Sequence, residues 1–521
     1  MPHAPAARVT RPPRSGRADT MTVSILVFRN SLSGRSGRHH VLKTVTGILL
    51  TGLILGGCTP YELKNLQEPN VSIPESFDAP LARVEPPERW WLAFEDPDLD
   101  RTVLEAFGAN LDLKQAWARL DQSLATATIV GAPVLPDATL DGSGSRQRID
   151  ASGARTYSNR FRLGLALTWE LDLWKKISNR AEAATLLATA SRDDVEQTAL
   201  LLSGTVVDLW FTIQEQEQLL RVLKEQIESS TNQLEVIEHR YGQGVGSALQ
   251  VLQQRLQLAQ VQSQVPAVVS SLELSRNRLS VVLGRAPQFP IEVAPKAVLP
   301  PLPPFPDLPA PRELLDTRPD LRAAYKRLSA ADLEVAAAVA DMLPTIRISL
   351  DASFNSPSLS SLFDDTLASM GGSLFQPVFD GDRRGAEVDR RKALMQERMD
   401  AFSEKFLVAL REIQDAIDQE ASQVELLDDV IAQISIASAT LAEARFSYAN
   451  GQNEYLDVIS ALQALQGVQR QEVTVRKQLL SIRSNLYLAL GGEWLDELEP
   501  LQETGRTSPR NSDMSTGNSS T

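Results

Sequence analysis

Residues 160–174, RFRLGLALTWELDLW, carry the clearest structural signal in the sequence. Large apolar side chains occupy every second position from Phe161 to Trp169, and polar or small side chains lie between them. An alternation of period two indicates a strand with one apolar face. Residues 345–355, TIRISLDASFN, show the same alternation. We therefore expect related strands in two distant parts of the chain.

The chain is also a tandem duplication. When it is shifted by 207 residues, one half matches the other over 44 residues without a gap. Identical pairs include Tyr241 and Tyr448, Gly244 and Gly451, Leu249 and Leu456, Arg276 and Arg483, and Leu279 and Leu486. A register kept this long predicts two copies of one unit, each of roughly 200 residues.

Each copy has the same predicted order: a helix, two strands, and a long helical hairpin. The first helices are expected at 99–129 and 319–342, the strands at 138–148, 160–174, 345–355 and 367–380, and the hairpin helices at 177–241, 248–283, 385–449 and 455–490. A helix of about 65 residues is a rod of roughly 100 Å. Residues 410–441 carry an apolar seam with steps of three and four residues, which is typical of a coiled coil.

The predicted strands point to an outer membrane. Each is about 10 residues long, and outer-membrane strands have about 9–11 residues that alternate between apolar and polar. Four strands cannot close a membrane barrel, because the smallest barrels have about eight. Since an open edge is not tolerated in lipid, this interpretation requires several chains.

Composition excludes several other classes. The chain is 43% apolar and 23% charged, which supports a folded core. Cys58 is the single cysteine, so intramolecular disulfides and cysteine-rich zinc sites are excluded. A net charge of −14 argues against nucleic acid as a partner. The sequence shows no nucleophile elbow, Cys–His pair or metal triad, so we expect no enzymatic activity, no metal and no cofactor.

The first 57 residues are basic, with a net charge of +7, whereas the rest of the chain is acidic, with a net charge of −21. Arg35, Arg38 and Lys43 precede an apolar run at 45–55, which is too short to span a bilayer of about 30 Å. This is the pattern of a secretory signal peptide. A start at Met21 or later, or an over-extended reading frame, remains an open alternative.

The signal ends in Leu55-Gly56-Gly57-Cys58, which resembles the bacterial lipobox. The resemblance implies cleavage before Cys58, diacylglycerol on its sulfur and an acyl chain on the new amino terminus. The alternative is an ordinary signal followed by an unrelated cysteine. Thr59 is compatible with sorting to the outer membrane, because lipoproteins kept in the inner membrane often carry Asp at that position.

Several motifs together identify a family. They are Trp90-Trp91 with Phe94-x-Asp96-Pro97-x-Leu99, Trp169-Glu170-Leu171-Asp172-Leu173-Trp174, Arg318-Pro319-Asp320-Leu321, and Gln376-Pro377-Val378-Phe379-Asp380-Gly381. With the lipobox, they make residues 58–495 resemble a TolC-like outer-membrane efflux protein, of the lipoprotein branch that partners resistance-nodulation-division pumps. One departure is Lys175, where the family often has Gly.

The resemblance implies a mainly α fold with a small β part. Long antiparallel coiled-coil helices would form a periplasmic α-barrel, and four strands per chain would contribute to a twelve-stranded β-barrel in a homotrimer. The implied partners are a periplasmic adaptor protein, an inner-membrane pump and outer-membrane lipid. The implied location is the outer membrane, where the protein is lipid-anchored and extends into the periplasm.

The hairpin tips are the expected functional sites. Each has a glycine that can end a helix with a positive φ. The resemblance implies that the adaptor contacts these tips, and the best candidates are Gly244, Ser247, Leu249, Gly451 and Leu456. The alternative is that these residues simply turn the chain.

Asp457 and Tyr448 are the candidate gate residues. Asp457 matches an aspartate that narrows the aperture in some family members, and three copies would form a cation-selecting carboxylate ring. The alternative is an acid at a helix start, which the helix dipole favours. Tyr448 matches the tyrosine of a link that closes the gate. The arginine of that link is Asn453 here, and a second gate aspartate is Ser460.

These observations divide the chain into six segments. They are a signal peptide (1–57), a lipidated N-terminal segment (58–98), the first copy (99–284), a Pro-rich connector (285–318), the second copy (319–491), and a C-terminal segment with a disordered tail (492–521). The predicted function is a passive export duct for small molecules in a tripartite efflux system. Alternatives are a structural coiled-coil envelope lipoprotein and the outer duct of a type I secretion system.

Overall fold

The computed structural model describes residues 61–64, 69–78, 84, 87, 89–151, 154–288 and 298–492. All of these residues belong to the unit Thr59–Thr521. Cys58 and the predicted signal peptide lie outside the described residues, as does residue 493 onward. No helix among the described residues is both long enough and apolar enough to cross a membrane.

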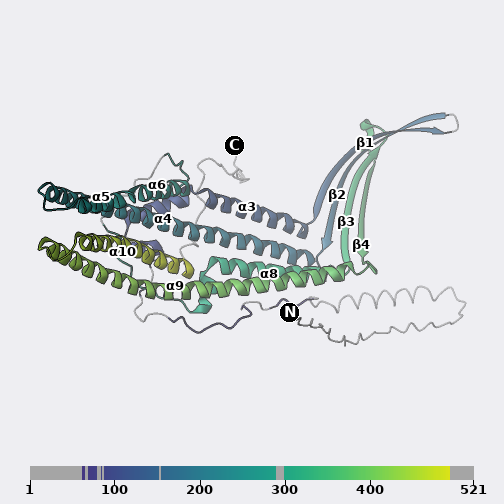
Figure 1. Ribbon diagram of the computed structural model, residues 1–521. Coiled ribbons are helices and arrows are strands. Elements are labelled where there is room, and N and C mark those ends of the chain that lie inside the picture. The colour runs from purple at the N-terminus through teal and green to yellow at the C-terminus, as the bar shows by residue number, and fades with distance from the viewer. Residues whose placement is uncertain are drawn as a thin grey trace, which may run out of the picture. The chain divides into compact units, whose positions relative to one another are not determined.

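Two equal helices confirm the duplication. Helix α4 (Lys176–Gly242) and helix α9 (Arg383–Ala449) have 67 residues each, and their bounds differ by the 207 residues of the sequence repeat. Each runs beside a return helix, as Figure 1 shows. In copy two this is α10 (Tyr455–Leu490). In copy one it is split into α5 (Ala248–Gln262) and α6 (Val265–Val282), because Pro266 at the start of α6 cannot continue a helix.

The first helix of copy one differs from the prediction. Residues 99–129 are not one helix but parts of α2 (Pro97–Ala109) and α3 (Leu111–Gly131). Asn110 separates them with an extended backbone, and its Oδ1 accepts hydrogen bonds from the N–H groups of Asp112 (2.9 Å) and Leu113 (3.0 Å). An N-cap of this kind starts a new helix. In copy two, α8 (Pro319–Ala340) is continuous.

Short elements complete the helical part. They are η1 (Trp90–Phe94), η2 (Ala132–Val134), η3 (Pro311–Glu313), α7 (Leu314–Thr317) and η4 (Leu359–Ser361). The predicted coiled-coil seam at 410–441 is only partly correct. Ile413, Ile417 and Leu441 are buried, whereas Val424 and Ile431 are 40% and 42% exposed. Helix α10 packs on one side of this stretch, so the side chains on its other side stay uncovered.

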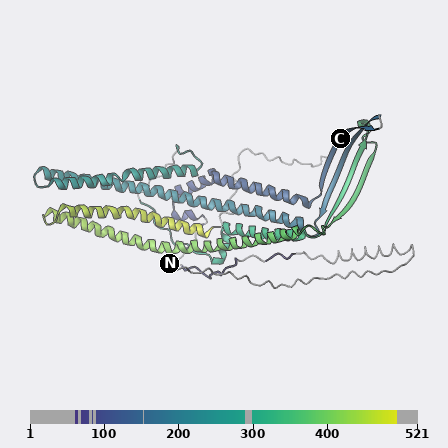
Figure 2. The ribbon, with the colours of Figure 1, turned by 45° about the vertical axis from the view of Figure 1, so that its right-hand side comes forward.

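Four antiparallel strands form one sheet beyond the ends of the long helices, as Figures 1 and 2 show. They are β1 (Asp137–Ala151), β2 (Ala154–Leu171), β3 (Thr345–Ser356) and β4 (Thr366–Phe375), in the order β1-β2-β3-β4. Two strands per copy were predicted, and two are present. The sheet pairs the copies through β2 and β3.

The length predicted for the first two strands is wrong. β1 has 15 residues and β2 has 18, against the expected 10, because the polar segments 149–151 and 154–159 are strand and not loop. β1 and β2 pair with each other up to Ala151 and Ala154, whereas β2 pairs with β3 only as far as Phe161. Two polar segments that satisfy each other's backbone groups can extend past the sheet without an apolar partner.

The alternation of period two is continuous across the sheet. The register aligns Leu140 with Leu165, and it aligns Leu167 with Leu350 and Leu350 with Met370, so these side chains share one face. They are not covered: Leu140 is 73% and Met370 is 76% exposed. The opposite face carries mostly polar or small residues. The sheet therefore presents a bare apolar face, which a soluble monomer rarely shows.

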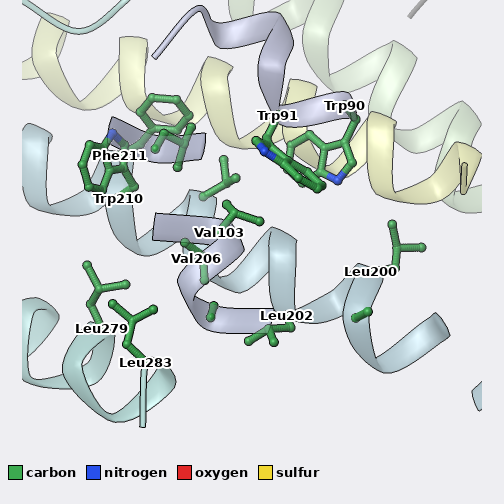
Figure 3. Close-up of a cluster of buried hydrophobic side chains, with 14 of the residues drawn as sticks. Trp90, Trp91, Val103, Leu200, Leu202, Val206, Trp210, Phe211, Leu279 and Leu283 are labelled. Atoms are coloured by element: carbon green, nitrogen blue, oxygen red, sulfur yellow. The ribbon is translucent and has the colours of Figure 1, made fainter. Parts of the chain in front are cut away.

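The largest core lies where α2, α4 and α6 meet, and Figure 3 shows part of it. The motif residues Trp90 and Trp91 pack edge to face here, with ring centroids 6.0 Å apart. Asp96 caps α2 and also accepts a hydrogen bond from Trp210 Nε1 at 2.9 Å. The Trp-Trp and Phe-x-Asp-Pro motifs are therefore anchors that hold the start of copy one on α4.

Candidate functional site: the hairpin tips

The tip of copy one is residues 239–249, and the tip of copy two is residues 446–457. They have nearly the same backbone. Gly244 has φ +75° and Gly451 has φ +73°, as a glycine at a helix end allows. The Gly244 N–H donates to the Tyr241 carbonyl at 2.9 Å, and the Gly451 N–H donates to the Tyr448 carbonyl at 3.1 Å. The positive φ expected from the sequence is confirmed at both glycines.

The start of the return helix differs between the tips. Ser247 caps α5 in a reciprocal capping box: its Oγ accepts from the Gln250 N–H at 3.4 Å, and Gln250 Oε1 accepts from the Ser247 N–H at 3.2 Å. Glu454 stands at the same place in copy two, and its side chain makes no capping bond. The first turn of α10 instead carries Asp457, which is exposed.

A chain of contacts joins the two tips. The guanidinium carbon of Arg240, on α4, lies 5.0 Å from the centroid of the Tyr448 ring on α9. Tyr448 and Tyr455 have ring centroids 5.1 Å apart. The Tyr455 hydroxyl then donates to Gln254 Oε1 on α5 at 2.7 Å. Copy two is therefore held between two helices of copy one.

Burial determines the protonation state of Tyr455 in this series of contacts. Tyr455 is buried, and burial raises the pKa of its hydroxyl to about 12. The hydroxyl therefore remains a hydrogen-bond donor to Gln254 at all physiological pH values. The cation–π contact of Arg240 adds about 0.5–2 kcal/mol, depending on how far it is desolvated.

The gate and adaptor-contact residues predicted from the sequence all lie in the tips. Leu249 is 63% exposed and Leu456 is 51% exposed, so both present apolar side chains to the outside. Tyr448 contacts the other copy, as described above, whereas the Asp457 carboxylate makes no ion pair within the described part of the chain. The structure does not test contact with an adaptor or gating, and these stay predictions.

Sequence reasoning missed Arg240, Gln254 and Tyr455. The family resemblance predicts that Asn453 removes the arginine that pairs with the gate tyrosine, yet Arg240 of the other copy places a cation on the Tyr448 ring. One signal was present in the sequence. Tyr455 aligns with Ala248, so a large aromatic side chain stands in one copy where the other has a methyl group.

Known proteins show the same architecture. The family described as "Outer membrane efflux protein" matches residues 103–285 and 310–492, one match for each copy. The chain therefore belongs to the outer membrane efflux protein family, whose members form channels in the outer membrane. Its function is that of an outer-membrane efflux channel.

Individual relatives cover most of the chain. It is 29% identical over 439 residues to the pyoverdine export outer membrane protein OpmQ of Pseudomonas putida, covering 81% of this chain and 91% of the relative. It is 26% identical to the probable outer membrane lipoprotein SilC of Salmonella typhimurium, covering 86% and 98%. Among solved structures, the outer-membrane channel OprN is 26% identical, with a TM-score of 0.75 and coverage of 82% and 99%. CusC shares the fold, with a TM-score of 0.77 at 23% identity, covering 82% of this chain and 99% of that one.

Proposed function

We propose that three copies of this chain form one continuous export duct, anchored by lipid on Cys58 and docked by its tips to a periplasmic adaptor and an inner-membrane pump. The observation that carries the proposal is the bare apolar face of the sheet. Leu140, Leu165 and Met370 are each more than half exposed on one face of four paired strands. Lipid is the environment that such a face requires.

The edges of the sheet support the trimer. β1 and β4 are the two outer strands of the sheet, so each has one row of backbone groups without a strand partner among the described residues. Lipid does not tolerate such edges, and pairing β1 of one chain with β4 of the next removes them. Three chains would supply twelve strands, within the size range of membrane barrels.

Two tryptophans mark where the sheet meets the helices. Trp169 Nε1 donates to the Val134 carbonyl at 3.0 Å, and Trp174 Nε1 donates to the Pro344 carbonyl at 2.8 Å. Tryptophan is enriched at membrane–water boundaries, where the ring is in the interface and the N–H finds a polar partner. These two tryptophans support a membrane boundary at the base of the strands, which would leave the long helices in the periplasm.

The tips would hold the gate. Three Asp457 side chains around an axis would form a ring of negative charge, and a ring of carboxylates selects cations in a constriction. Arg240 and Tyr448 would restrain the opening, because their contact joins the tips of the two copies. The lipid on Cys58 and the adaptor contacts at Gly244, Ser247, Leu249, Gly451 and Leu456 complete the proposal.

Conductance of the purified trimer in a planar lipid bilayer tests this function. Wild type should give discrete small openings, and Asp457→Ala should enlarge them and reduce cation selectivity. Arg240→Gln should lengthen the openings. Asp428→Ala is the matched control, because Asp428 is an exposed acid in the middle of α9. A protein that is monomeric in the membrane and never conducts would overturn the proposal in favour of a structural lipoprotein.

The choice between efflux and type I secretion needs a different measurement. Deletion of the protein from its cells should raise the intracellular level of small toxic compounds and leave the secretion of proteins unchanged. Loss of a secreted protein, with compound levels unaltered, would instead identify the duct of a type I system.

A further inference from the structure

The β1–β2 hairpin extends past the rest of the sheet. β2 pairs with β3 only as far as Phe161, and beyond that point β1 and β2 pair with each other alone. Figure 1 shows this overhang at the end of the sheet that lies away from the long helices. Residues 145–160 contain four arginines, one aspartate and no other charged residue. The overhang is therefore basic, although the chain as a whole has a net charge of −14.

The strand register decides which arginines share the apolar face of the sheet. Alternate side chains of a strand point to opposite faces, and directly paired residues share a face. Leu140 and its partner Leu165 lie on the apolar face. Arg146 and Arg148 follow Leu140 at even spacing on β1, and Arg155 precedes Leu165 at even spacing on β2. These three arginines therefore point to the same side as the apolar residues.

The apolar face ends just before the arginines. On β2 it runs from Trp169 to Phe161, which is about 26 Å at 3.3 Å per residue. At the strand tilt of about 35–45° in membrane barrels, this length covers about 20 Å of membrane depth. Outer-membrane barrels have an apolar band about 25 Å tall with aromatic residues at both edges. Trp169 and Phe161 therefore fit the two edges of the band.

The arginines lie directly outside that band. Arg146 pairs with Asn159, two residues beyond Phe161, and Arg148 pairs with Tyr157, four residues beyond it. With the same rise and tilt, these positions are about 5 and 10 Å further along the membrane normal. The headgroup layer of a bilayer is about 5–8 Å thick on each side. The long side chains of Arg146 and Arg148 therefore reach the headgroups.

The contacts within this group leave it positively charged and accessible. Asp150 is its one carboxylate, with an oxygen 3.2 Å from Arg148 and another 3.8 Å from Arg155. The side chains of Arg148 and Arg155 are still 58% and 74% exposed. The guanidinium carbon of Arg146 lies 4.8 Å from the centroid of the Tyr157 ring. Three guanidinium groups thus share one carboxylate, and an anion can approach them from outside.

We infer that Arg146, Arg148 and Arg155 form a binding site for the phosphate groups of a phosphorylated lipid in the outer leaflet. A guanidinium presents parallel N–H donors that match two phosphate oxygens. The acyl chains of the same lipid would lie on the apolar face, because both surfaces are on one side of the hairpin. The inference rests on the proposed placement of the sheet in the outer membrane and adds a lipid that the sheet selects.

The second copy has no equivalent of this site. The segment between β3 and β4, residues 357–365, contains Asp364 and Asp365 and no arginine. Leu359 and Phe363 in that segment are 68% and 66% exposed. The basic group therefore belongs to the first copy alone, and a trimer would offer three separate lipid sites.

Binding of purified lipopolysaccharide, a phosphorylated glycolipid, to the purified trimer in detergent tests the inference. R146Q/R148Q should weaken binding by about fivefold for each arginine removed, as expected for an arginine near an anionic surface. R160Q/R162Q is the matched control, because it removes two arginines from the opposite face of the same hairpin. It should bind the lipid as the parent does.

A change in the opposite direction guards against a variant that misfolds. Asp150→Asn removes the carboxylate between Arg148 and Arg155 and should tighten binding severalfold, which damage to the fold would not do. Lipopolysaccharide stripped of its phosphates should bind the parent as weakly as the intact lipid binds R146Q/R148Q.

Three results would overturn the inference. They are equal binding by R146Q/R148Q and R160Q/R162Q, equal binding of the intact and the stripped lipid, and displacement of the lipid by millimolar inorganic phosphate, which would identify a site for free anions. A trimer that conducts while giving any of these results leaves the proposed duct standing. Protein that is monomeric in the membrane and never conducts overturns the proposed function as well.

Discussion

The hairpins of the two copies have the same backbone conformation but different side chains in their interiors. α4 and α9 have the same length, and both tips turn through a glycine with φ near +75°. Inside the hairpins, copy one has Ser230 and Gln257 where copy two has Ala437 and Ala464. Duplication preserved the turn and the helix length, which backbone geometry requires, while the side chains inside the hairpins diverged.

The largest difference should appear at the equivalent arginines Arg483 and Arg276. Arg483 is 2% exposed and pairs twice with Glu420, at 2.7 and 2.6 Å, and it also donates to the carbonyls of Pro303 and Pro304 in the connector. Arg276 is 27% exposed and pairs with Glu217. Arg483→Ala should lower the free energy of unfolding by about 3–5 kcal/mol, because it leaves a buried carboxylate unpaired.

Arg276→Ala is the matched control for that experiment, because it also removes the partner of a buried carboxylate, Glu217, whereas the bonds to the connector carbonyls belong to Arg483. Its loss should be clearly smaller than that of Arg483→Ala. Both are measured by chemical denaturation followed by circular dichroism in detergent. Equal losses of unfolding free energy would show that the bonds from Arg483 to the connector do not stabilise the protein.

A smaller effect is expected where the strands lead into the long helices. Lys175 has φ +58° and the equivalent Asp382 has φ +64°. A left-handed backbone costs a residue with a Cβ atom roughly 1–2 kcal/mol, and Asp tolerates it better than Lys. Lys175→Gly should therefore stabilise the protein by about 1 kcal/mol, and Asp382→Gly should stabilise it less. Thermal unfolding of the two variants side by side decides this, and destabilisation by Lys175→Gly would contradict it.

The smallest effect concerns a buried acid that only copy one has. Glu215 is buried, and burial raises its pKa, whereas the equivalent Ser422 is exposed. The folded protein therefore holds this proton more tightly than the unfolded chain does. Glu215 favours folding below its unfolded pKa of about 4.3, and that contribution is lost as the pH rises through its raised value.

Glu215→Gln should remove this pH dependence. The stability of the variant relative to the parent should rise as the pH increases from about 4.3, the unfolded pKa, through the raised pKa of Glu215, and Ser422→Ala should show no such trend. Thermal unfolding at several pH values gives the comparison. A constant difference between Glu215→Gln and the parent would show that the carboxylate keeps its ordinary pKa in the fold.

The sequence could predict the parts of this protein that depend on local geometry. Period two indicated the strands because alternate side chains point to opposite faces, and the 207-residue register indicated equal hairpins. The tip glycines were visible because only a residue without a Cβ adopts a positive φ freely. The break at Asn110 was not foreseen, because a capping asparagine looks like any polar residue until its partners are known.

What only the tertiary structure decided are the contacts between distant segments. Arg240 and Tyr448 are more than 200 positions apart in the chain, and no local pattern joins them. The polar ends of β1 and β2, residues 149–151 and 154–159, are strand because the two strands satisfy each other's backbone groups. The sequence by itself thus determined the repeat, the strands and the turns. The fold decided which face of each helix is buried, because burial depends on what the whole chain, and in our proposal its neighbour, places against that face.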